Sequence, residues 1–467
     1  MASKWRPTVF GELVDFVSEK AKAQDAAYAT YVSTENMQAD FGGVEIAVTV
    51  PKSGSVTKFI IGDTLFSNIR TYFKKVWQAE FDGYCSNDVL VFRTKDETAL
   101  RPGFLNNLCR WEKFTEFSIR TSKGAKMPRG DKDALAQFKF ELPSIEEQRA
   151  IAKTLRSFDN KIDLNRRINQ TLEAMAQAIF KSWFVDFDPV KAKIAAIEQG
   201  QDPLRAAMRA TSGKTDAELD QMPREHHDQL AATAALFPDA MEESELGETP
   251  KGWSLVPFGS LLSYTIGGDW GIEAPDTVKD TRVAIIRGTD IPDLDQAQLS
   301  RVPIRYTNQK KLATRRLQVG DIVLEVSGGS KNQPTGRSFY MTANALREFD
   351  CPVEPASFCR LLRPVSIEVG VVLSLHLSYI YQQGKTWEYQ NQSTGIANFQ
   401  TSHFLEAELV VAPPNSVLEV FFRMVSPILE RRHDAQGRKL ALTRDTLLPK
   451  LMSGELSVSC PFNEDAQ

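Results

Sequence analysis

The sequence lacks long apolar runs, and its few cysteines show no paired spacing. No stretch reaches the roughly 18 apolar residues of a membrane-spanning helix. The N-terminal MASKWRPTVF lacks the apolar core of a signal peptide, so we expect a cytoplasmic location without membrane contact. Five cysteines without C-x-x-C spacing favour buried thiols over disulfides or a zinc site. They are Cys85, Cys109, Cys351, Cys359 and Cys460.

The sequence also lacks the motifs of several enzyme classes. It has no G-x4-G-K-[ST] phosphate loop and therefore no ATP motor. Neither Asp188-Pro189-Val190 nor Pro413-Pro414-Asn415 matches the Asn/Asp-Pro-Pro-aromatic motif of adenine methyltransferases, and no glycine-rich cofactor loop accompanies them. The five histidines include no H-x-x-x-H pair. We therefore expect no catalytic residues, no metal ligands and no cofactor in this chain, although scattered carboxylates exclude a nuclease only weakly.

The charge is unevenly distributed along the chain. The net charge is −4, but residues 186–250 hold 14 Asp/Glu and 6 Lys/Arg, a balance of −8, which leaves +4 for the remainder. A remainder this mildly basic permits nucleic-acid binding only through local patches and with help from partner subunits.

Several sequence motifs of the first half recur in the second half, and an internal repeat of this kind indicates a repeated domain. Trp5–Leu13 and Trp253–Leu261 both read W-x4-F-G-x-L, with an offset of 248 residues. Further matches follow in the same order, at Ile61–Leu65 with Val319–Val323, Phe81-Asp82 with Phe349-Asp350, Ser122–Ala125 with Ser393–Ile396, and Leu142-Pro143 with Ala412-Pro413. The sequence therefore predicts a duplication, and the alternative is two unrelated mixed domains.

We expect an α+β fold in which two pseudo-repeated mixed α/β domains are separated by two long antiparallel coiled-coil helices. The short apolar strands of each mixed domain are punctuated by Gly, Asn, Ser and Pro. The expected segments are a first mixed domain at 1–143, a central long-helix spacer at 144–187, an acidic helical and flexible connector at 188–250, a second mixed domain at 251–413, a C-terminal long-helix spacer at 414–456 and a tail at 457–467.

The first long helix is expected to start at a capping box of Ser144 and Glu147 and to run uninterrupted to Phe180, about 54 Å. Heptad spacing predicts that it pairs with a helix in the second half. The seam and partner-binding positions are Ile151, Leu155, Phe158, Ile162, Leu172, Ile179, Val417, Phe421, Met424, Ile428, Leu447 and Leu451. Asn165 and Asn169 either set the register of this seam or face solvent.

The second helix and the connector are expected to be less regular. Pro427 should kink the second helix and Gly437 should weaken it. In the connector, Lys191–Glu198 and Pro203–Arg209 read as short helices, whereas the aromatic-free run Met208–Asp220 should be mobile.

Two similar domains on a rigid spacer suggest a caliper for double-stranded DNA, because successive major-groove exposures on one face lie about 34 Å apart. Polar loops in both domains carry side chains suited to base edges and phosphates. The candidate DNA-binding residues are Ser67, Asn68, Arg70, Tyr72, Lys74, Lys75, Lys123 and Lys126 in the first domain, and Ser327, Ser330, Lys331, Asn332, Gln333, Thr335, Arg337, Gln390, Asn391, Gln392 and Asn398 in the second. Residue by residue, ordinary surface turns are the competing interpretation.

Several segments resemble the specificity subunits of type I restriction-modification systems. They are Leu142–Ala152 (LPSIEEQRAIA), Asp159–Glu173, Ser244–Trp253 (SELGETPKGW), Leu447–Leu456 (LLPKLMSGEL), Phe81–Asn87 and Gly328–Asn332, spread over nearly the whole chain. The resemblance implies that each mixed domain reads one half of an asymmetric bipartite DNA target. It implies helical regions that dock two modification subunits, which carry S-adenosylmethionine, and restriction subunits, which use ATP and Mg²⁺.

The long acidic connector departs from the simplest form of that family. The main alternative function is a two-domain coiled-coil scaffold of another assembly with no DNA role, and a second alternative is a standalone enzyme.

Overall fold

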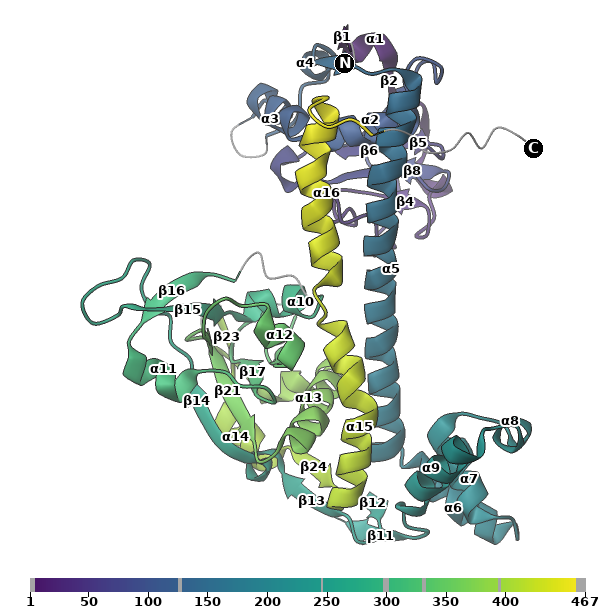
Figure 1. Cartoon of the computed structure of the whole chain (residues 1–467), viewed down its shortest axis with the longest axis vertical. Coiled ribbons are helices and arrows are strands. Elements are labelled where there is room, and N and C mark those ends of the chain that lie inside the picture. Colours follow the sequence, from purple (N-terminus) through teal and green to yellow (C-terminus); the bar gives the residue numbers. More distant parts are fainter. Residues whose placement is uncertain are drawn as a thin grey trace. The chain divides into compact units, whose positions relative to one another are not determined.

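The computed structural model describes residues 5–124, 128–244, 247–296, 302–329, 333–393 and 396–458. The chain divides into two compact units (Figure 1). Unit 1 comprises residues 1–163 and 439–467, and unit 2 comprises residues 164–438. Helices α5 (Ile145–Phe184) and α16 (Gln436–Met452) run through the boundary and contribute to both units.

Unit 1 is a mixed unit of short strands and helices. Its strands are β1 (Arg6–Val9), β2 (Val14–Val17), β3 (Lys20–Lys22), β4 (Tyr31–Val32), β5 (Ser55–Phe59), β6 (Thr64–Ser67), β7 (Val76–Gln78), β8 (Gly83–Cys85), β9 (Val89–Thr94) and β10 (Lys139–Leu142). Its shorter helices are α1 (Phe10–Leu13), α2 (Pro102–Arg110), α3 (Glu112–Thr121), α4 (Lys132–Ala136) and the 3-10 turns η1 (Ala23–Asp25) and η2 (Thr71–Phe73).

Unit 2 begins with the second half of α5, which is followed by a helical connector and a second mixed region. Its strands are β11 (Met241–Ser244), β12 (Gly247–Pro250), β13 (Ser254–Pro257), β14 (Leu262–Gly267), β15 (Thr281–Ile286), β16 (Ile304–Thr307), β17 (Ile322–Glu325), β18 (Ser327–Gly328), β19 (Ser338–Tyr340), β20 (Val353–Pro355), β21 (Cys359–Pro364), β22 (Gln390–Ser393), β23 (Ile396–Phe399) and β24 (Leu409–Ala412). Its helices are α6 (Asp188–Glu198), α7 (Pro203–Ser212), α8 (Asp216–Asp220), α9 (Arg224–Ala235), α10 (Ile291–Leu294), α11 (Gln309–Arg315), α12 (Ala343–Arg347), α13 (Ile367–Gln382), α14 (Thr401–Ala407), α15 (Asn415–Arg432) and the 3-10 turns η3 (Phe258–Leu261), η4 (Gly288–Asp290) and η5 (Lys385–Tyr389).

The two units contain the same sheet. In unit 1 the strand order is β2-β9-β6-β7, and in unit 2 it is β14-β21-β17-β19, with antiparallel pairing throughout both. A second two-stranded pairing also repeats, β1 with β10 and β13 with β24. This shared topology confirms the duplication predicted from the sequence.

The repeated Gly-Asp turn makes the same contacts in both units. Asp63 accepts two hydrogen bonds at 2.7 Å from the Arg93 guanidinium and one at 2.9 Å from the Ile60 amide. Asp321 accepts two at 2.8 and 2.7 Å from Arg363 and one at 2.7 Å from the Gln318 amide. The arginine stabilises a buried carboxylate just before β6 and β17, because a charge removed from water requires a partner. The preceding glycines, at positions 62 and 320, adopt the left-handed backbone that favours glycine.

Helix α5 has 40 residues and begins at the predicted capping box. The Ser144 amide donates to Glu147 Oε2 at 3.1 Å, and the Glu147 amide donates to Ser144 Oγ at 3.3 Å. Together these bonds satisfy donors that an uncapped helix start would leave free.

Within unit 1, the first half of α5 lies antiparallel to α16. Asp159 accepts hydrogen bonds from Arg110 and, at 2.9 Å, from Arg444 of α16. These two arginines hold the pKa of Asp159 below its usual range even though burial acts in the opposite direction. The apolar seam joins residues of both helices in the unit 1 core, which contains Ile151, Leu155, Leu448 and Leu451.

Within unit 2, the second half of α5 lies antiparallel to α15 (Figure 1). Asn169 Nδ2 donates to the Arg432 carbonyl at 3.0 Å, and Glu173 forms an ion pair with the Arg432 side chain. Asn169 therefore lies in the seam and satisfies a carbonyl at the end of α15, which decides between the two alternatives that the sequence left open for it.

The second long helix is divided into α15 and α16, separated by residues 433–435. Helix α15 continues through Pro427 to Arg432, so the helix does not end at the proline. Its buried residues are Val417, Phe421, Val425 and Leu429. The expected seam residue Met424 is 37% exposed, and Ile428 is partly buried against the core. The buried face of α15 departs from the predicted heptad pattern, because its buried side chains recur every four residues and not at alternating spacings of three and four.

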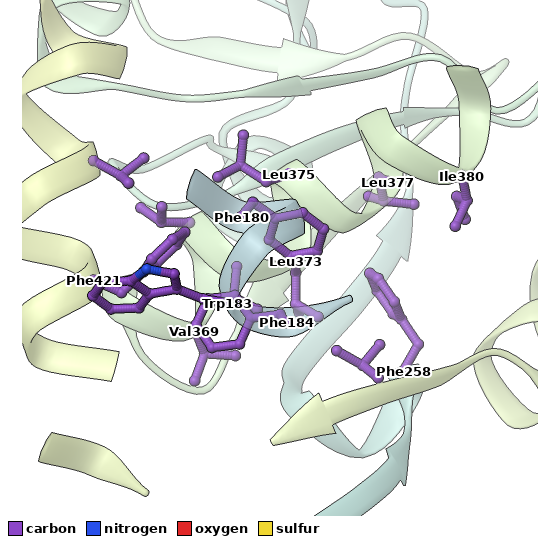
Figure 2. Close-up of a cluster of buried hydrophobic side chains, with 14 of the residues drawn as sticks. Phe180, Trp183, Phe184, Phe258, Val369, Leu373, Leu375, Leu377, Ile380 and Phe421 are labelled. Carbon is purple, nitrogen blue, oxygen red and sulfur yellow. The ribbon is translucent and has the colours of Figure 1, made fainter. Parts of the chain in front are cut away.

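Aromatic side chains join α5 and α15 to the core of unit 2 (Figure 2). Phe184 packs edge-on against Phe421 at 4.7 Å between ring centroids, and Trp183 lies 5.7 Å from the same ring. Trp183 also packs edge-on against Phe237, which follows the connector helices. These contacts fasten the end of α5 and the connector within unit 2.

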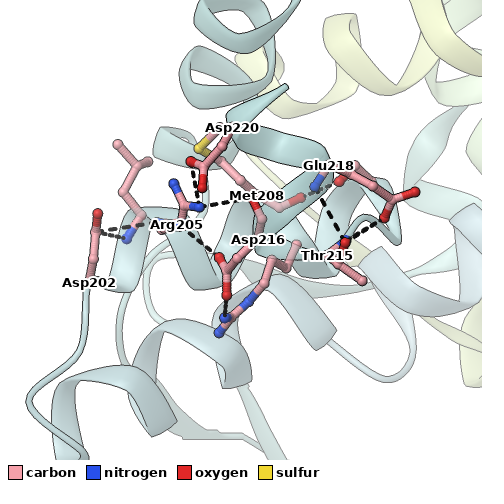
Figure 3. A network of polar contacts seen from close by, with 10 residues as sticks. Asp202, Arg205, Met208, Thr215, Asp216, Glu218 and Asp220 are labelled. Carbon is pink, nitrogen blue, oxygen red and sulfur yellow. Dashed lines mark hydrogen bonds and ion pairs between the residues drawn. The ribbon is translucent and has the colours of Figure 1, made fainter. Parts of the chain in front are cut away.

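The connector is helical where the sequence analysis expected mobility. Helices α6 and α7 include the predicted short helices, and α7 and α8 cover most of the run Met208–Asp220. Arg205 donates to Asp216 at 2.6 Å and to Asp220 at 2.7 Å (Figure 3). Buried Met208 and Leu219 belong to a small cluster beneath these polar contacts. Local ion pairs and a capping box at Thr215 compensate for the missing aromatic residues.

Two sequence expectations concern thiols and membranes. Cys85, Cys109 and Cys359 are free and buried, as expected, and Cys351 is half-buried. Cys460 lies outside the described residues. No helix in the described part of the chain is long and apolar enough for a membrane crossing.

Candidate nucleic-acid interface

In unit 1, the candidate loop is residues 68–75, which connect β6 to β7. Arg70 and Lys74 flank η2 and both adopt left-handed backbone, with φ of 51° and 53°. Such conformations are costly for residues other than glycine and gather at functional sites. The loop is supported by backbone hydrogen bonds of 3.0 Å from Asp40 to Phe73 and from Phe41 to Lys74.

The loop presents an exposed aromatic pair beside Arg70. Tyr72 and Phe73 are 48% and 40% exposed, and their ring centroids lie 4.7 Å apart. Arg70 is exposed and Lys74 is half-buried. The loop therefore carries cationic and aromatic groups at the surface of unit 1.

Other predicted residues of this loop support its conformation. Ser67 is 3% exposed and donates its hydroxyl to the Ile69 carbonyl at 3.1 Å. Lys75 Nζ donates to the Thr34 carbonyl at 2.6 Å, and burial lowers the pKa of its ammonium. Asn68 is half-buried, and its backbone N–H donates to the Asp88 carbonyl at 2.8 Å. The burial of Ser67 argues against direct DNA contact by this residue.

A second segment of unit 1 lies against this loop. Arg129 pairs in antiparallel bridges with both Ile69 and Lys123. Lys123 is exposed and ion-paired with Asp131, whose carboxylate raises the pKa of the lysine. Arg129 is exposed and donates to Asp88 Oδ1 at 2.9 Å. The structure thus brings predicted Lys123 to predicted loop 68–75, whereas Lys126 lies outside the described residues.

In unit 2, the corresponding loop connects β17 to β19. Strand β18 of this loop pairs with β23, which in turn pairs with β22. Gln390 Oε1 accepts hydrogen bonds from the Thr335 amide at 2.9 Å and from its hydroxyl at 3.3 Å. The two predicted groups, one before Arg337 and one around Asn391, therefore meet in one three-stranded sheet.

Three predicted residues of unit 2 hold this loop in place. Thr335 is fully buried, and the side-chain oxygen of Gln390 is occupied by its contacts with Thr335. Arg337 is bonded to Glu325, with 2.9 Å between Arg337 Nε and Glu325 Oε2. That hydrogen bond raises the pKa of Arg337, and the Glu325 side chain is 1% exposed. The burial of Thr335 and the ion pair of Arg337 argue against direct DNA contact by these two residues.

The exposed candidates in unit 2 carry no charge. Gln333, Asn391 and Asn398 are exposed, and Ser327 is half-buried. Ser330, Lys331 and Asn332 lie outside the described residues, as does the side chain of Gln392. The described surface of this loop pair is therefore amide-rich, whereas that of unit 1 is cationic and aromatic.

The sequence analysis missed Arg129, Asp88 and Glu325. Arg129 lies between two repeated segments, Ser122–Ala125 and Leu142-Pro143, and no repeated motif includes it. The structure places Arg129 three residues before α4, as it places Asn398 three residues before α14.

Known proteins are similar to this chain in sequence. A family model described as "Type I restriction modification DNA specificity domain" matches residues 13–174. The specificity subunit of the HindI type I restriction enzyme of Haemophilus influenzae is 28% identical over 483 residues, covering 97% of this chain and all of that protein. The MjaIX specificity subunit of Methanocaldococcus jannaschii is 24% identical over 373 residues, covering 76% of this chain and 69% of the relative.

The fold has a solved counterpart. The S subunit of a type I restriction-modification system from M. genitalium matches with a TM-score of 0.51 at 14% identity, covering 96% of both chains. Over nearly its whole length, the chain is therefore similar in sequence to the specificity subunits of type I restriction-modification systems, and its fold resembles that of a solved S subunit.

Proposed function

We propose that this chain is the DNA sequence-recognition subunit of a type I restriction-modification complex and that it reads an asymmetric bipartite target. The observation that carries the proposal is the repetition of one architecture with different exposed side chains. In both units, the loop after β6 or β17 pairs through its backbone with a second polar segment, which contains Arg129 in unit 1 and Asn398 in unit 2. Because the exposed residues differ between the units, the two half-sites should differ too.

The partners follow from this role. We expect double-stranded DNA, two methyltransferase subunits and restriction subunits to bind this chain. S-adenosylmethionine, ATP and Mg²⁺ belong to those partner subunits, and this chain contributes recognition without catalysis. A cytoplasmic location is part of the same proposal.

The long helices are proposed to set the gap between the half-sites. At 1.5 Å per residue, the 40 residues of α5 extend about 60 Å. That length exceeds the roughly 34 Å between successive major-groove exposures on one face of B-DNA. The helices also offer the docking surfaces proposed for the methyltransferase subunits.

A scaffold without a DNA role is not favoured. The matching family model describes a DNA specificity domain, and the relatives are specificity subunits. The domain limits 1–143, 188–250 and 251–413 expected from the sequence remain proposals for the boundaries of functional modules.

The deciding experiment measures adenine methylation by the chain together with its methyltransferase partner. Methylation at one gapped sequence should require both proteins. Exchange of residues 67–75 for the loop of another family member should change one half-site, and exchange of residues 326–337 should change the other. A simultaneous change of both half-sites on one exchange contradicts the two-reader proposal.

The spacer role has its own test. Removal of whole helical turns from the middle of α5, with matching removal at the start of α16, should shorten the permitted gap. A methylated sequence with an unchanged gap contradicts the role of α5 as a spacer. Methylation by the wild-type complex in the same assay is the control.

A further inference from the structure

Arg129 and Asn398 occupy the same position in the two units. Each lies three residues before a helix, α4 for Arg129 and α14 for Asn398. Each pairs with a residue two places beyond the end of a corresponding sheet strand. Arg129 pairs with Ile69 after β6, and Asn398 pairs with Ser327 after β17. The duplication therefore provides one shared structural position that carries an arginine in unit 1 and an asparagine in unit 2.

In unit 2 this position is the centre of a polar row across a sheet. Asn398 pairs directly with Asn391 of β22 on one side and with Ser327 of β18 on the other. Paired residues on adjacent strands point to the same face, about 4.8 Å apart. Ala397 and Phe399, the neighbours of Asn398, are 4% and 5% exposed, so the alternate face is buried and Asn398 lies on the solvent face.

The side chains of the polar row in unit 2 form no hydrogen bonds with described residues of this chain. Within the described part of the chain, no residue forms a hydrogen bond with the side chains of Asn391, Asn398 or Ser327. By contrast, the buried-face residue Gln390 is bonded to Thr335. The exposed amides are therefore available as paired donor and acceptor groups.

In unit 1 the row is cationic. Arg129 pairs with Lys123 on one side and Ile69 on the other. The Arg129 side chain is 58% exposed, and one guanidinium nitrogen donates to Asp88 at 2.9 Å. An arginine has five donors, so this contact orients the planar group and leaves others free. The adjacent carboxylate also weakens any attraction to phosphate, which favours a directional contact.

These two side chains differ in the base that each can pair with. In the major groove, which admits a two-stranded β-ribbon, arginine pairs in bidentate fashion with guanine O6 and N7. Asparagine pairs likewise with adenine N6 and N7. A neutral asparagine has no charge to attract phosphate, so its exposed row suits base edges.

We propose that Arg129 and Asn398 are equivalent base-reading residues, with Arg129 contacting a guanine in one half-site and Asn398, beside Asn391, contacting an adenine in the other. The proposal rests on the proposed function, because it requires that both units bind DNA. It predicts a recognition sequence with a guanine in the unit 1 half and an adenine in the unit 2 half.

The test is a methylation profile of genomic DNA by the complex of this chain with its methyltransferase partner. Arg129→Asn should lower methylation of the wild-type sequence roughly tenfold to hundredfold and relax one position of the unit 1 half-site. Asn398→Ala should do the same at one position of the other half-site. Lys58→Asn, which removes an exposed ion pair with Glu19 in unit 1, should change neither sequence nor rate.

Arg129→Lys separates base reading from phosphate binding. Lysine keeps the charge but loses the planar fork, so discrimination at the guanine should fall while the salt dependence of DNA binding stays the same. If Arg129→Lys keeps full discrimination, or if Arg129→Asn weakens all sequences equally, the base-reading assignment is wrong. Circular dichroism checks that each variant folds. If Arg129→Asn does not fold, Arg129→Lys still tests the proposal, because lysine keeps a cation next to Asp88.

The two levels of the proposal fail differently. A wild-type complex that methylates no gapped sequence contradicts the proposed function. Two other results contradict only the assignment of Arg129 and Asn398. One is a wild-type complex that methylates a gapped sequence without guanine in one half and adenine in the other. The other is a pair of variants that keep the wild-type specificity.

Discussion

The two units build the same sheet but stabilise its recognition loop in different ways. In unit 1, the end of β6 is Ser67, and the loop turns through left-handed Arg70 and Lys74. In unit 2, the end of β17 is Glu325, paired with Arg337, and the loop turns through glycines at positions 328, 329 and 336 with positive φ. The loop of unit 1 therefore places two non-glycine residues in strained backbone conformations, whereas the loop of unit 2 relies on glycine and a buried ion pair.

The comparison separates what the duplication preserves from what it changes. The Asp63–Arg93 and Asp321–Arg363 pairs, which hold the sheet, have nearly the same geometry. The loops that follow share only their connections. A rigid repeated sheet with variable loops lets one fold present different recognition chemistry, because loop residues tolerate change that buried sheet residues do not.

The largest expected effect concerns the ion pair that only unit 2 has. Arg337→Ala leaves Glu325 charged, buried and without its partner, so the free energy of unfolding should fall by about 3 kcal/mol. Urea unfolding measures this loss. Ser67→Ala, the matched change in unit 1, removes one neutral hydrogen bond and should cost about 1 kcal/mol. Equal losses for both variants would contradict the contrast between the loops.

The shared pairs should respond alike. Asp63→Ala and Asp321→Ala each free a partly exposed arginine, 34% and 27% exposed, and should each lower the free energy of unfolding by about 2 kcal/mol. Chemical unfolding followed by circular dichroism compares them. Asp15→Ala, at an exposed carboxylate in unit 1, is the control with little expected effect. A large loss in only one unit would show that the pairs are not equivalent.

A buried carboxylate in unit 2 predicts a pH-dependent difference. Burial, reinforced by Asp269, raises the pKa of Glu354 to about 7, and among the described residues neither of its carboxylate oxygens has a hydrogen-bond partner. The folded state binds this proton more tightly than the unfolded state, so the associated stability is complete below about pH 4.5 and is lost as pH rises through 7. Strand β20, which carries Glu354 at its middle position, and strand β8 of unit 1 each have three residues and a parallel neighbour. The middle residue of β8 is Tyr84, which carries no carboxyl group.

Glu354→Gln therefore should raise the unfolding temperature at pH 8 and leave it nearly unchanged at pH 4.5. The rise of the pKa from 4.5 to about 7 limits the gain at pH 8 to about 3 kcal/mol. Thermal unfolding from pH 4.5 to 8 measures the change, with Tyr84→Phe as the control in unit 1. A gain of the same size at both pH values would exclude ionisation of Glu354 as the cause.

The smallest expected effect concerns α5, whose two halves belong to different units. Asn169→Ala removes the hydrogen bond to the Arg432 carbonyl and should lower the free energy of unfolding of unit 2 by about 1 kcal/mol. Gln170→Ala, at an exposed position one residue along the helix, is the matched control. No difference between these variants in chemical unfolding would contradict a stabilising role for Asn169.

The sequence predicted most of the fold, because the motifs that indicate it are local. The capping box at Ser144, the Gly-Asp turns and the repeated W-x4-F-G-x-L motif each specify a backbone conformation from a few neighbouring residues. Their order along the chain was enough to predict a duplicated α+β fold with a long helix. The heptad pattern failed at Met424, because the packing partners of α15 bury Val425 and Leu429 instead.

The site was predicted as segments but not as individual contacts. The sequence predicted DNA contact for the polar loops around Arg70, Ser327 and Asn391. Their composition could not separate exposed side chains from supporting ones. Gln390, Thr335 and Arg337 have the same polar character as Asn391 and Asn398. Only the strand pairing shows that Gln390 faces inward and Asn398 outward.

By itself, the sequence determined the duplication, the start of the long helix and the family resemblance, since each depends on short-range order along one chain. The tertiary structure alone decided which polar side chains remain exposed and that Arg129 and Asn398 share one position. Those properties arise from contacts between segments about 60 residues apart, as between Ile69 and Arg129, and from burial. Local sequence patterns do not encode them, because burial depends on which distant segment covers a residue.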